Sequence, residues 1–405
     1  MQSFSLTGRA EQLGRHAAAF LGLSIPISVA LDNVLLALVA MLWIASGGLK
    51  QKVETIVANR VALSALALFG MLIAGLSYGT RYPGDGLGFL GKYIDLLFIP
   101  IFITLFQDAR TRDMALRWFC AAMVLSFLAA DLMTLGLLAG NPLLSRGPDS
   151  LGAFKHSITH GLLSAFAAFV FALLAHREVR WPNRALFAVL ALIAVKNVIL
   201  VSVSRTAYLV LVLLAIYFCF ALFRKRSLVI AVLLIGTFFS AIYGGSDVFR
   251  ERVDTVFADS RELRSRLPSR ESVTMRLEWY RDSLDLVRDH PLLGSGTGSF
   301  PRVYAEAVKD SQKVRSRNPH NEYLLIMVQL GLAGLAVLLY LFWAQWRLAT
   351  RLATPLEWHL ARGLVLTMAV GYLFNSWLLD HTEGLLYAWL TGVLFAGLKS
   401  PQNSL

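Results

Sequence analysis

The 405-residue chain is 56% hydrophobic and only 16% charged. Soluble chains usually carry about a quarter charged residues, so the composition excludes a soluble enzyme on a membrane anchor, and it excludes disorder, which requires low hydrophobicity. The net charge of +12 would suit nucleic-acid binding in a soluble protein, but in a membrane protein it indicates basic cytoplasmic loops and no nucleic-acid partner. Cys120 and Cys219 lie in apolar runs and predict neither a disulfide framework nor thiol chemistry.

Apolar runs along the chain predict about twelve membrane-spanning helices, because a helix needs about 20 apolar residues to cross a bilayer. The first two runs are short and are separated only by Asp32-Asn33, which predicts a tight helical hairpin. We therefore expect an all-α polytopic membrane protein. Its predicted spans are 16–31, 34–48, 61–78, 87–106, 115–139, 157–175, 185–203, 206–223, 227–243, 321–346, 359–379 and 384–398.

Lys and Arg are unevenly divided between the two sets of short loops that these spans define. The set that includes both ends of the chain holds 18 of them, and the other set holds 4, namely Arg81, Arg146, Lys155 and Arg205. Because short loops rich in Lys and Arg stay in the cytoplasm, both termini are predicted to be cytoplasmic.

A long polar segment, residues 244–320, interrupts this pattern on the outer side. Long loops are translocated regardless of their charge, so the segment is compatible with the orientation. Between Ser269 and His290 apolar residues recur at three- and four-residue steps, which predicts an amphipathic helix, and a second short helix is expected at about 301–313. The predicted organisation is spans one to nine in 1–243, an outer helical domain in 244–320, and spans ten to twelve in 321–405.

Arg205 lies between two apolar spans with almost no loop around it. A polar side chain at membrane depth is costly and calls for a functional hypothesis. Either this arginine snorkels to lipid headgroups, or it is a fixed cation that binds an anionic group, because guanidinium grips phosphate oxygens in pairs.

His320 and Asn321 open the tenth predicted span from the outer side, and Gly331 and Gly334 follow within that span. The glycines predict a close approach by another helix. The histidine is either a polar cap at the interface or a general base, since its ordinary pKa lies near neutrality.

Other polar residues are predicted on the same outer side. Arg276 lies on the amphipathic helix, Asp380 and His381 form a tip between the last two spans, and Lys155 and Arg146 precede the sixth span. Arg276 resembles an ordinary charged surface residue when it is considered alone.

His156 and His160 have the spacing that places two metal ligands on one helix face. No carboxylate accompanies them in that segment, so we expect no metal site there and no metal or other cofactor in the reaction.

Together these features resemble the O-antigen ligase family. Its motif is His, then Asn, Ser or Gln, nine residues, Gly, two residues, and Gly, Thr or Tyr, and His320, Asn321, Gly331 and Gly334 fit it fully. Ser204-Arg205 ahead of a span resembles the family's arginine. The segments that begin at Arg276 and at His290 resemble the family's large periplasmic loop.

The resemblance implies a GT-C-like glycosyltransferase of the bacterial inner membrane, with its active site facing the periplasm. Its donor would be O-antigen on undecaprenyl diphosphate, its acceptor a sugar hydroxyl of lipid A-core, and its surroundings membrane lipids. The transfer would be inverting and independent of metal. The implied catalytic residues are His320, Arg205 and Arg276, the implied donor ligands are Arg205, Arg276, Arg146 and Lys155, and the implied supporting residues are Asn321, Asp380 and His381.

Two alternatives remain open at the level of sequence. An O-antigen polymerase of the same superfamily uses the same donor chemistry. A lipid or solute transporter would need charges along a path through the membrane, and the predicted spans hold few, namely Lys92, Asp95, Asp131 and Lys196.

Overall fold

The computed structural model describes residues 6–79, 83–138, 153–202, 204–222, 272–311 and 313–398, together with positions 236, 243–244, 250 and 254. Outside these described residues lie Arg146, most of the ninth predicted span and most of residues 244–271. Every regular element within the described ranges is a helix, which confirms the all-α class.

The first half of the chain forms a series of helices. Within the predicted fourth span, residues 87–106, the turn at Tyr93–Ile94 separates two shorter helices. The elements are α1 (Leu6–Ser24), α2 (Val29–Ala45), α3 (Leu49–Ala58), α4 (Arg60–Tyr78), α5 (Pro83–Lys92), α6 (Asp95–Leu105), α7 (Ala109–Thr134), α8 (Ser157–Arg177), α9 (Trp181–Lys196), a π-helical turn (Asn197–Val201) and α10 (Arg205–Leu222).

The second half contains the predicted outer helices and the last spans. The amphipathic helix is α13 (Ser272–Asp289), and the predicted short helix is α14 (Phe300–Ala307), which ends earlier than expected. They are followed by α15 (Glu322–Leu348), a 3₁₀ turn (Ala349–Arg351), α16 (Pro355–Gly371) and α17 (His381–Phe395).

Within the described part of the chain, seven helices are long and apolar enough to cross a membrane, and α2 and α3, bent by 114°, make an eighth if they count as one span. This supports a polytopic membrane protein, but twelve spans are not confirmed. The first, eleventh and twelfth predicted spans correspond to α1, α16 and α17, which fall short in length or apolar character.

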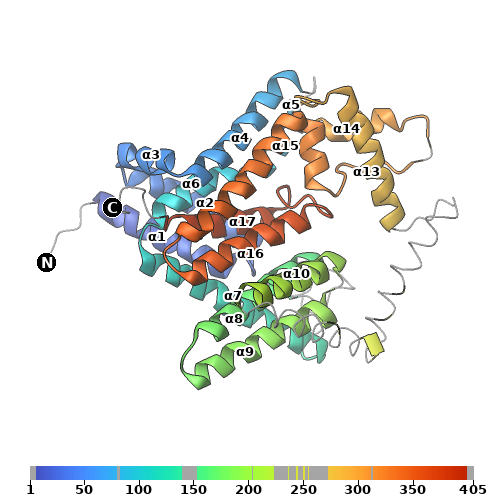
Figure 1. The fold of residues 1–405 in the computed structure, drawn as a ribbon. Helices are drawn as coiled ribbons and strands as arrows, with labels where there is room; N and C mark the ends of the chain where they lie inside the picture. The colour runs from blue at the N-terminus through green and yellow to red at the C-terminus, as the bar shows by residue number, and fades with distance from the viewer. Residues whose placement is uncertain are drawn as a thin grey trace.

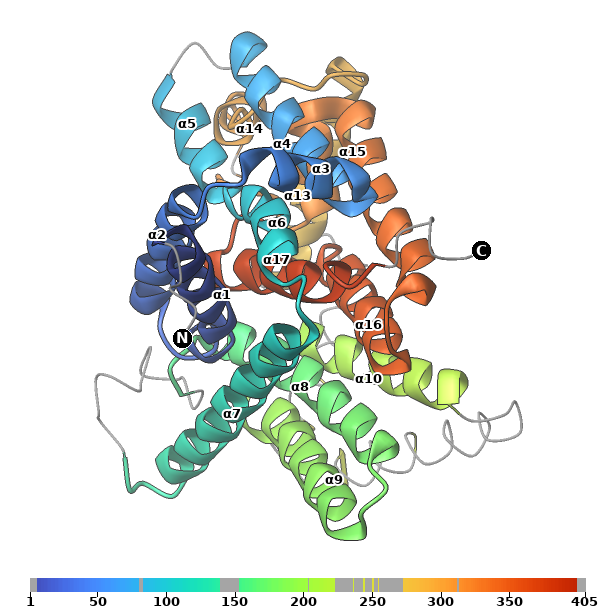
Figure 2. The same ribbon diagram turned by 90° about the vertical axis from the view of Figure 1, so that its left-hand side faces the viewer.

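Helix α17 lies at the centre of the bundle (Figure 2). It packs against α6 and α16, and every residue from Thr382 to Phe395 is buried. Protein side chains therefore surround this 15-residue helix where lipid would surround a peripheral span. Around it α1 packs on α2 and α7, α8 packs on α9 and α10, and α4 packs on α15.

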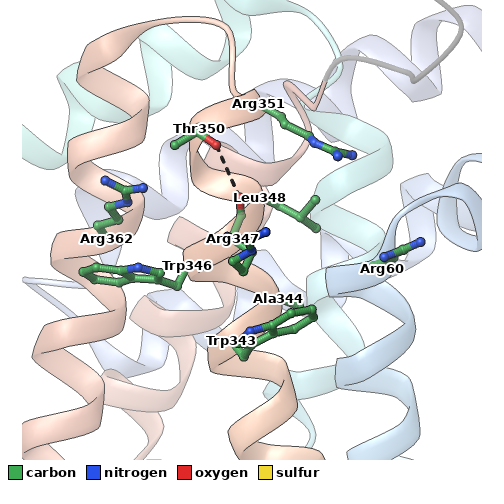
Figure 3. A pocket seen from close by; sticks show the side chains of 9 residues that line it. All are labelled: Arg60, Trp343, Ala344, Trp346, Arg347, Leu348, Thr350, Arg351 and Arg362. Atoms are coloured by element: carbon green, nitrogen blue, oxygen red, sulfur yellow. Dashed lines mark hydrogen bonds between the residues drawn. The ribbon is translucent and has the colours of Figure 1, made fainter.

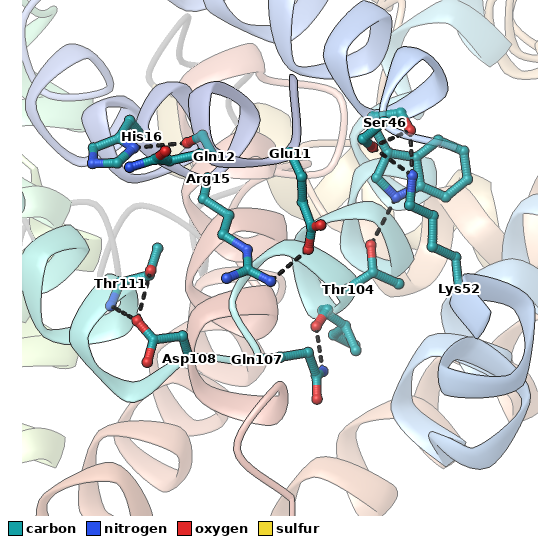
Figure 4. Close-up of polar contacts among 12 residues, drawn as sticks. Glu11, Gln12, Arg15, His16, Ser46, Lys52, Thr104, Gln107, Asp108 and Thr111 are labelled. Atoms are coloured by element: carbon teal, nitrogen blue, oxygen red, sulfur yellow. Dashed lines mark hydrogen bonds and ion pairs between the residues drawn. The ribbon is translucent and has the colours of Figure 1, made fainter. Parts of the chain in front are cut away.

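Helices α13 and α14 lie on one side of the molecule, and the described chain begins and ends on the opposite side (Figure 1). On that opposite side, polar contacts fix the bend between α2 and α3 (Figure 4). The ammonium of Lys52 donates to the carbonyl of Trp43 and to Ser46 Oγ, 2.7 Å away. The indole of Trp43 donates to Thr104 Oγ1 at 2.7 Å and so ties α2 to α6.

Candidate active site

His320 and Asn321 lie at the start of α15, where both are held by hydrogen bonds. Asn321 caps the helix by accepting from the Leu324 amide at 3.0 Å, and its own amide donates to the Leu373 carbonyl at 3.0 Å. His320 has a φ of 52°, in the left-handed region that few residues other than glycine adopt. Its amide donates to Asn318 Oδ1 at 2.7 Å, which helps to hold this conformation.

One face of α13 covers His320. Trp279 stacks on the imidazole, with ring centroids 5.1 Å apart and planes inclined by 28°. The hydroxyl of Tyr280 lies 3.1 Å from the His320 carbonyl and 2.8 Å from the Leu373 carbonyl. Arg276, one turn earlier on the same face, donates to the Phe374 carbonyl at 3.4 Å.

The connection between α16 and α17 joins these elements to α10. Its Leu373 and Phe374 carbonyls accept from α13 and from Asn321. Asn375, in the same connection, donates to Thr206 Oγ1 at 3.2 Å. Thr206 directly follows Arg205, the half-buried first residue of α10. The start of α10, helix α13 and the start of α15, which are far apart in the chain, thus meet at the α16–α17 connection.

The charges of these residues act on one another. Burial lowers the pKa of His320, and the positive charge of Arg276 lowers it further. Burial also lowers the pKa of Arg276, and the charge of Arg205 adds to this effect, whereas Tyr280 raises it. The three residues predicted to be catalytic, Arg205, Arg276 and His320, are therefore brought together.

Glu322 is a buried neighbour of this site that the sequence analysis missed. Its carboxylate accepts from the Tyr93 hydroxyl at 3.0 Å and from the Leu378 amide at 3.0 Å, and its amide donates to the Tyr372 carbonyl at 2.8 Å. The available signal was a carboxylate in the first turn of an apolar span, which is costly without partners. Glu322 ties the start of α15 to the α16–α17 connection.

Lys155 belongs to a second polar cluster beside the start of α17. It is 5% exposed, donates to Thr382 Oγ1 at 3.0 Å, and lies 3.7 Å from Asp32 Oδ2. His381 Nε2 lies 3.8 Å from the same oxygen. Asp32 therefore balances the lysine charge, and Lys155 differs in this respect from Arg276, which faces His320. Asp380 is exposed at the start of α17.

His156 and His160 make separate contacts. His156 Nδ1 accepts from the Ile158 amide at 3.4 Å at the start of α8. His160 is buried, and its Nε2 lies 3.1 Å from Asn197 Oδ1 in the π-helical turn. Among the residues that the structure describes, no group of three His, Cys, Asp or Glu side chains is placed to hold a metal ion.

Gly331 serves a different purpose from the one predicted. It interrupts α15 with a φ of 65°, and a Cβ there would lie 2.3 Å from the backbone of Leu292. A loop, not a helix, approaches it. The amides of Leu332 and Ala333 donate to the carbonyls of Pro291 and Leu292 at 2.8 and 3.2 Å. The neighbours of Gly334 are Leu330 and Ile326 of its own helix.

The sequence model of the O-antigen ligase family matches residues 191–339. This range contains Arg205, Arg276, His320 and Gly331, and it runs from the end of α9 into α15. This match supports membership of the chain in the O-antigen ligase family. Members of this superfamily, which includes ligases and polymerases, are membrane glycosyltransferase-like enzymes. No curated protein matches the chain.

Proposed function

We propose that this protein is an O-antigen ligase of the bacterial inner membrane, with its active site facing the periplasm. It transfers O-antigen polysaccharide from undecaprenyl diphosphate to a sugar hydroxyl of lipid A-core. The observation that carries this proposal is the meeting of Arg205, Arg276 and His320 at the α16–α17 connection. The diphosphate of the donor needs cationic groups, which the two arginines provide. The hydroxyl of the acceptor needs a base, which the histidine provides.

The two arginines bind the diphosphate of the donor. Arg205 and Arg276 are half-buried and close enough for the charge of one to disfavour the charge of the other. A dianionic group between them would relieve that repulsion. Planar guanidinium groups grip phosphate oxygens in pairs, and each preorganised contact to the developing charge contributes about 10²–10³ in rate. Arg146 and Lys155 are further proposed donor ligands, and Asn321, Asp380 and His381 support the site.

His320 removes the proton from the acceptor hydroxyl, a role worth about 10²–10⁴ in rate. Burial and Arg276 lower its pKa, so the imidazole is neutral and able to accept a proton near pH 7. The hydroxyl oxygen attacks the anomeric carbon, the bond from sugar to phosphate breaks, and undecaprenyl diphosphate leaves with the electron pair. Attack opposite the leaving group inverts the anomeric centre, and the arginines supply the positive charge without a metal.

The test is a ligation assay with purified protein, lipid-linked O-antigen and lipid A-core, with and without EDTA. We expect product in which several repeats are attached to the core, and no loss of activity with EDTA. His320→Gln should bind donor but lose at least about a hundredfold in single-turnover rate. His156→Gln, which alters another histidine on the outer side, is the matched control.

Three results would contradict the proposal. Extension of the glycan on the lipid donor, with no transfer to the core, would indicate a polymerase. Wild-type rates in His320→Gln would show that the residue is not the base. If EDTA abolished the activity and one divalent metal restored it, the reaction would depend on a metal and the arginine mechanism would be wrong.

A further inference from the structure

A second basic site lies at the end of α15 farthest from His320. Helix α15 runs from Glu322, beside His320, to Leu348 and is interrupted at Gly331. At the far end of α15 a pocket of about 340 Å³ opens between that end, the 3₁₀ turn that follows it, Arg362 in the middle of α16 and the start of α4 (Figure 3). Its polar lining consists chiefly of Arg60, Arg347, Arg351 and Arg362, with Trp343 and Trp346.

These arginines have no carboxylate to neutralise them. Within the described residues none of the four takes part in an ion pair, and Glu357 of α16 is bound to Arg112 at 3.1 Å. The guanidinium of Arg362 lies over the ring of Trp346, 5.1 Å from its centroid, and its Nε is buried without a hydrogen-bond acceptor. Four positive charges around one pocket repel one another, and an anion bound there would stabilise the arrangement.

An apolar groove of about 680 Å³ continues from this pocket and shares Arg60 with it. Beyond Arg60, α4 contributes Leu63, Ser64 and Ala67, and α15 contributes Ala336, Val337 and Tyr340. The groove follows about two helical turns, or about 10 Å, along α4 and about one turn along α15. A soluble anion would leave this groove unfilled, whereas a lipid would place an acyl chain in it.

We propose that the pocket and groove form a binding site for one anionic phospholipid of the leaflet opposite the active site. The phosphate lies among the four arginines, and an acyl chain lies between α4 and α15. Trp343, which is 52% exposed, is at the level of the headgroup, where tryptophan is enriched in membrane proteins. The distribution of Lys and Arg assigns this leaflet to the cytoplasmic side, where basic pockets between helices bind anionic headgroups.

Native mass spectrometry of the purified protein tests this site. The protein is titrated with phosphatidylglycerol, with phosphatidylethanolamine of the same chains, and with glycerol phosphate as a soluble headgroup. We expect one phosphatidylglycerol to be retained in preference to phosphatidylethanolamine and not to be displaced by glycerol phosphate. Each arginine near the surface contributes about fivefold in affinity, so Arg347→Gln with Arg351→Gln should weaken retention about thirtyfold.

Two further variants make the result specific. Arg177→Gln with Arg180→Gln removes two exposed arginines that do not line the pocket, and it should leave retention unchanged. Ala67→Trp fills the groove without changing any charge and should also weaken retention. Equal retention of the two lipids, equal loss in the control pair, or displacement by glycerol phosphate would each overturn the proposal. Unchanged retention of the lipid by Ala67→Trp would overturn the placement of the acyl chain in the groove.

Discussion

His320 is constrained through its backbone as well as its ring. Asn318 and Tyr280 hold the main chain at positive φ, while Trp279 fixes the plane of the imidazole. A general base must lie within about 3 Å of the proton that it removes, so a fixed ring is an advantage for this role. Arg276 is part of the same arrangement, because its charge helps to keep the imidazole neutral.

The pH dependence of the enzyme should reflect the position of Arg276 beside His320. Burial and Arg276 disfavour the imidazolium, so the pKa of His320 lies below its ordinary value of 6.5. We expect transfer activity to fall only at pH values below about 6.5, where His320 becomes protonated. Arg276→Gln removes the positive charge and should raise the pKa of His320, although burial still lowers it.

Histidine NMR of the ¹⁵N-labelled protein measures both titrations, with His320→Gln used to assign the signal. His156, which caps α8, serves as an internal reference, and its signal should be the same in wild type and Arg276→Gln. A pKa of His320 that is unchanged or lower in Arg276→Gln would show that Arg276 does not act on the imidazole.

At the scale of elements, the interruption of α15 explains why the sequence motif has a glycine at position 331. Gly331 adopts a left-handed conformation so that the backbone at Leu292 can reach α15. The loop is held there by hydrogen bonds, including Ser295 to the Val328 carbonyl at 2.8 Å and Gly298 to Gln329 Oε1 at 2.7 Å. This loop follows α13, so its position helps to determine where Arg276 and Trp279 lie.

Gly331→Ala should therefore destabilise the protein and displace the loop. The backbone of Gly331, with φ 65° and ψ −163°, lies in a region that costs a residue with a Cβ about 1–3 kcal/mol, and the contact with Leu292 adds about 1–3 kcal/mol. We expect a lower melting temperature in detergent together with reduced transfer activity. Gly70→Ala is the control, because a Cβ at Gly70 meets nothing within 4 Å. Equal melting temperatures for the two variants would contradict this account of the motif.

For the whole molecule, the two proposed binding sites lie at opposite ends of α15. The ends of the described chain lie on the face opposite α13 and α14 (Figure 1). The distribution of Lys and Arg predicts that this face is cytoplasmic, and that assignment stays a prediction. Glu306 on α14 and Arg180 at the α8–α9 turn are both exposed, and they mark the two faces.

This arrangement predicts the accessibility of single cysteines in intact cells. With Cys120 and Cys219 replaced by Ser, a membrane-impermeant maleimide that reaches the periplasm should label Glu306→Cys. Arg180→Cys should be labelled only after the inner membrane is permeabilised. The opposite pattern would invert the orientation, and labelling of both in intact membranes would refute the placement of the two faces.

The sequence was informative where a local pattern has one structural meaning. Three- and four-residue spacing predicted α13, and the polar step before the tenth span predicted the start of α15, which Asn321 caps. It was less informative for α17, which the apolar run predicts as a span. Burial by surrounding helices and exposure to lipid favour the same residues, so an apolar run does not distinguish a central helix from a peripheral one.

The sequence by itself determined the all-α membrane class, the amphipathic helix α13 and the residues of the family motif, because these depend on composition and on spacing along one segment. Only the tertiary structure decided which charges meet. Lys155 is balanced by Asp32, 123 positions away by their numbers, whereas Arg276 faces His320 and Arg205. The physical reason is that the electrostatic effect of a side chain depends on its distance from other charges, and the packing of helices sets that distance.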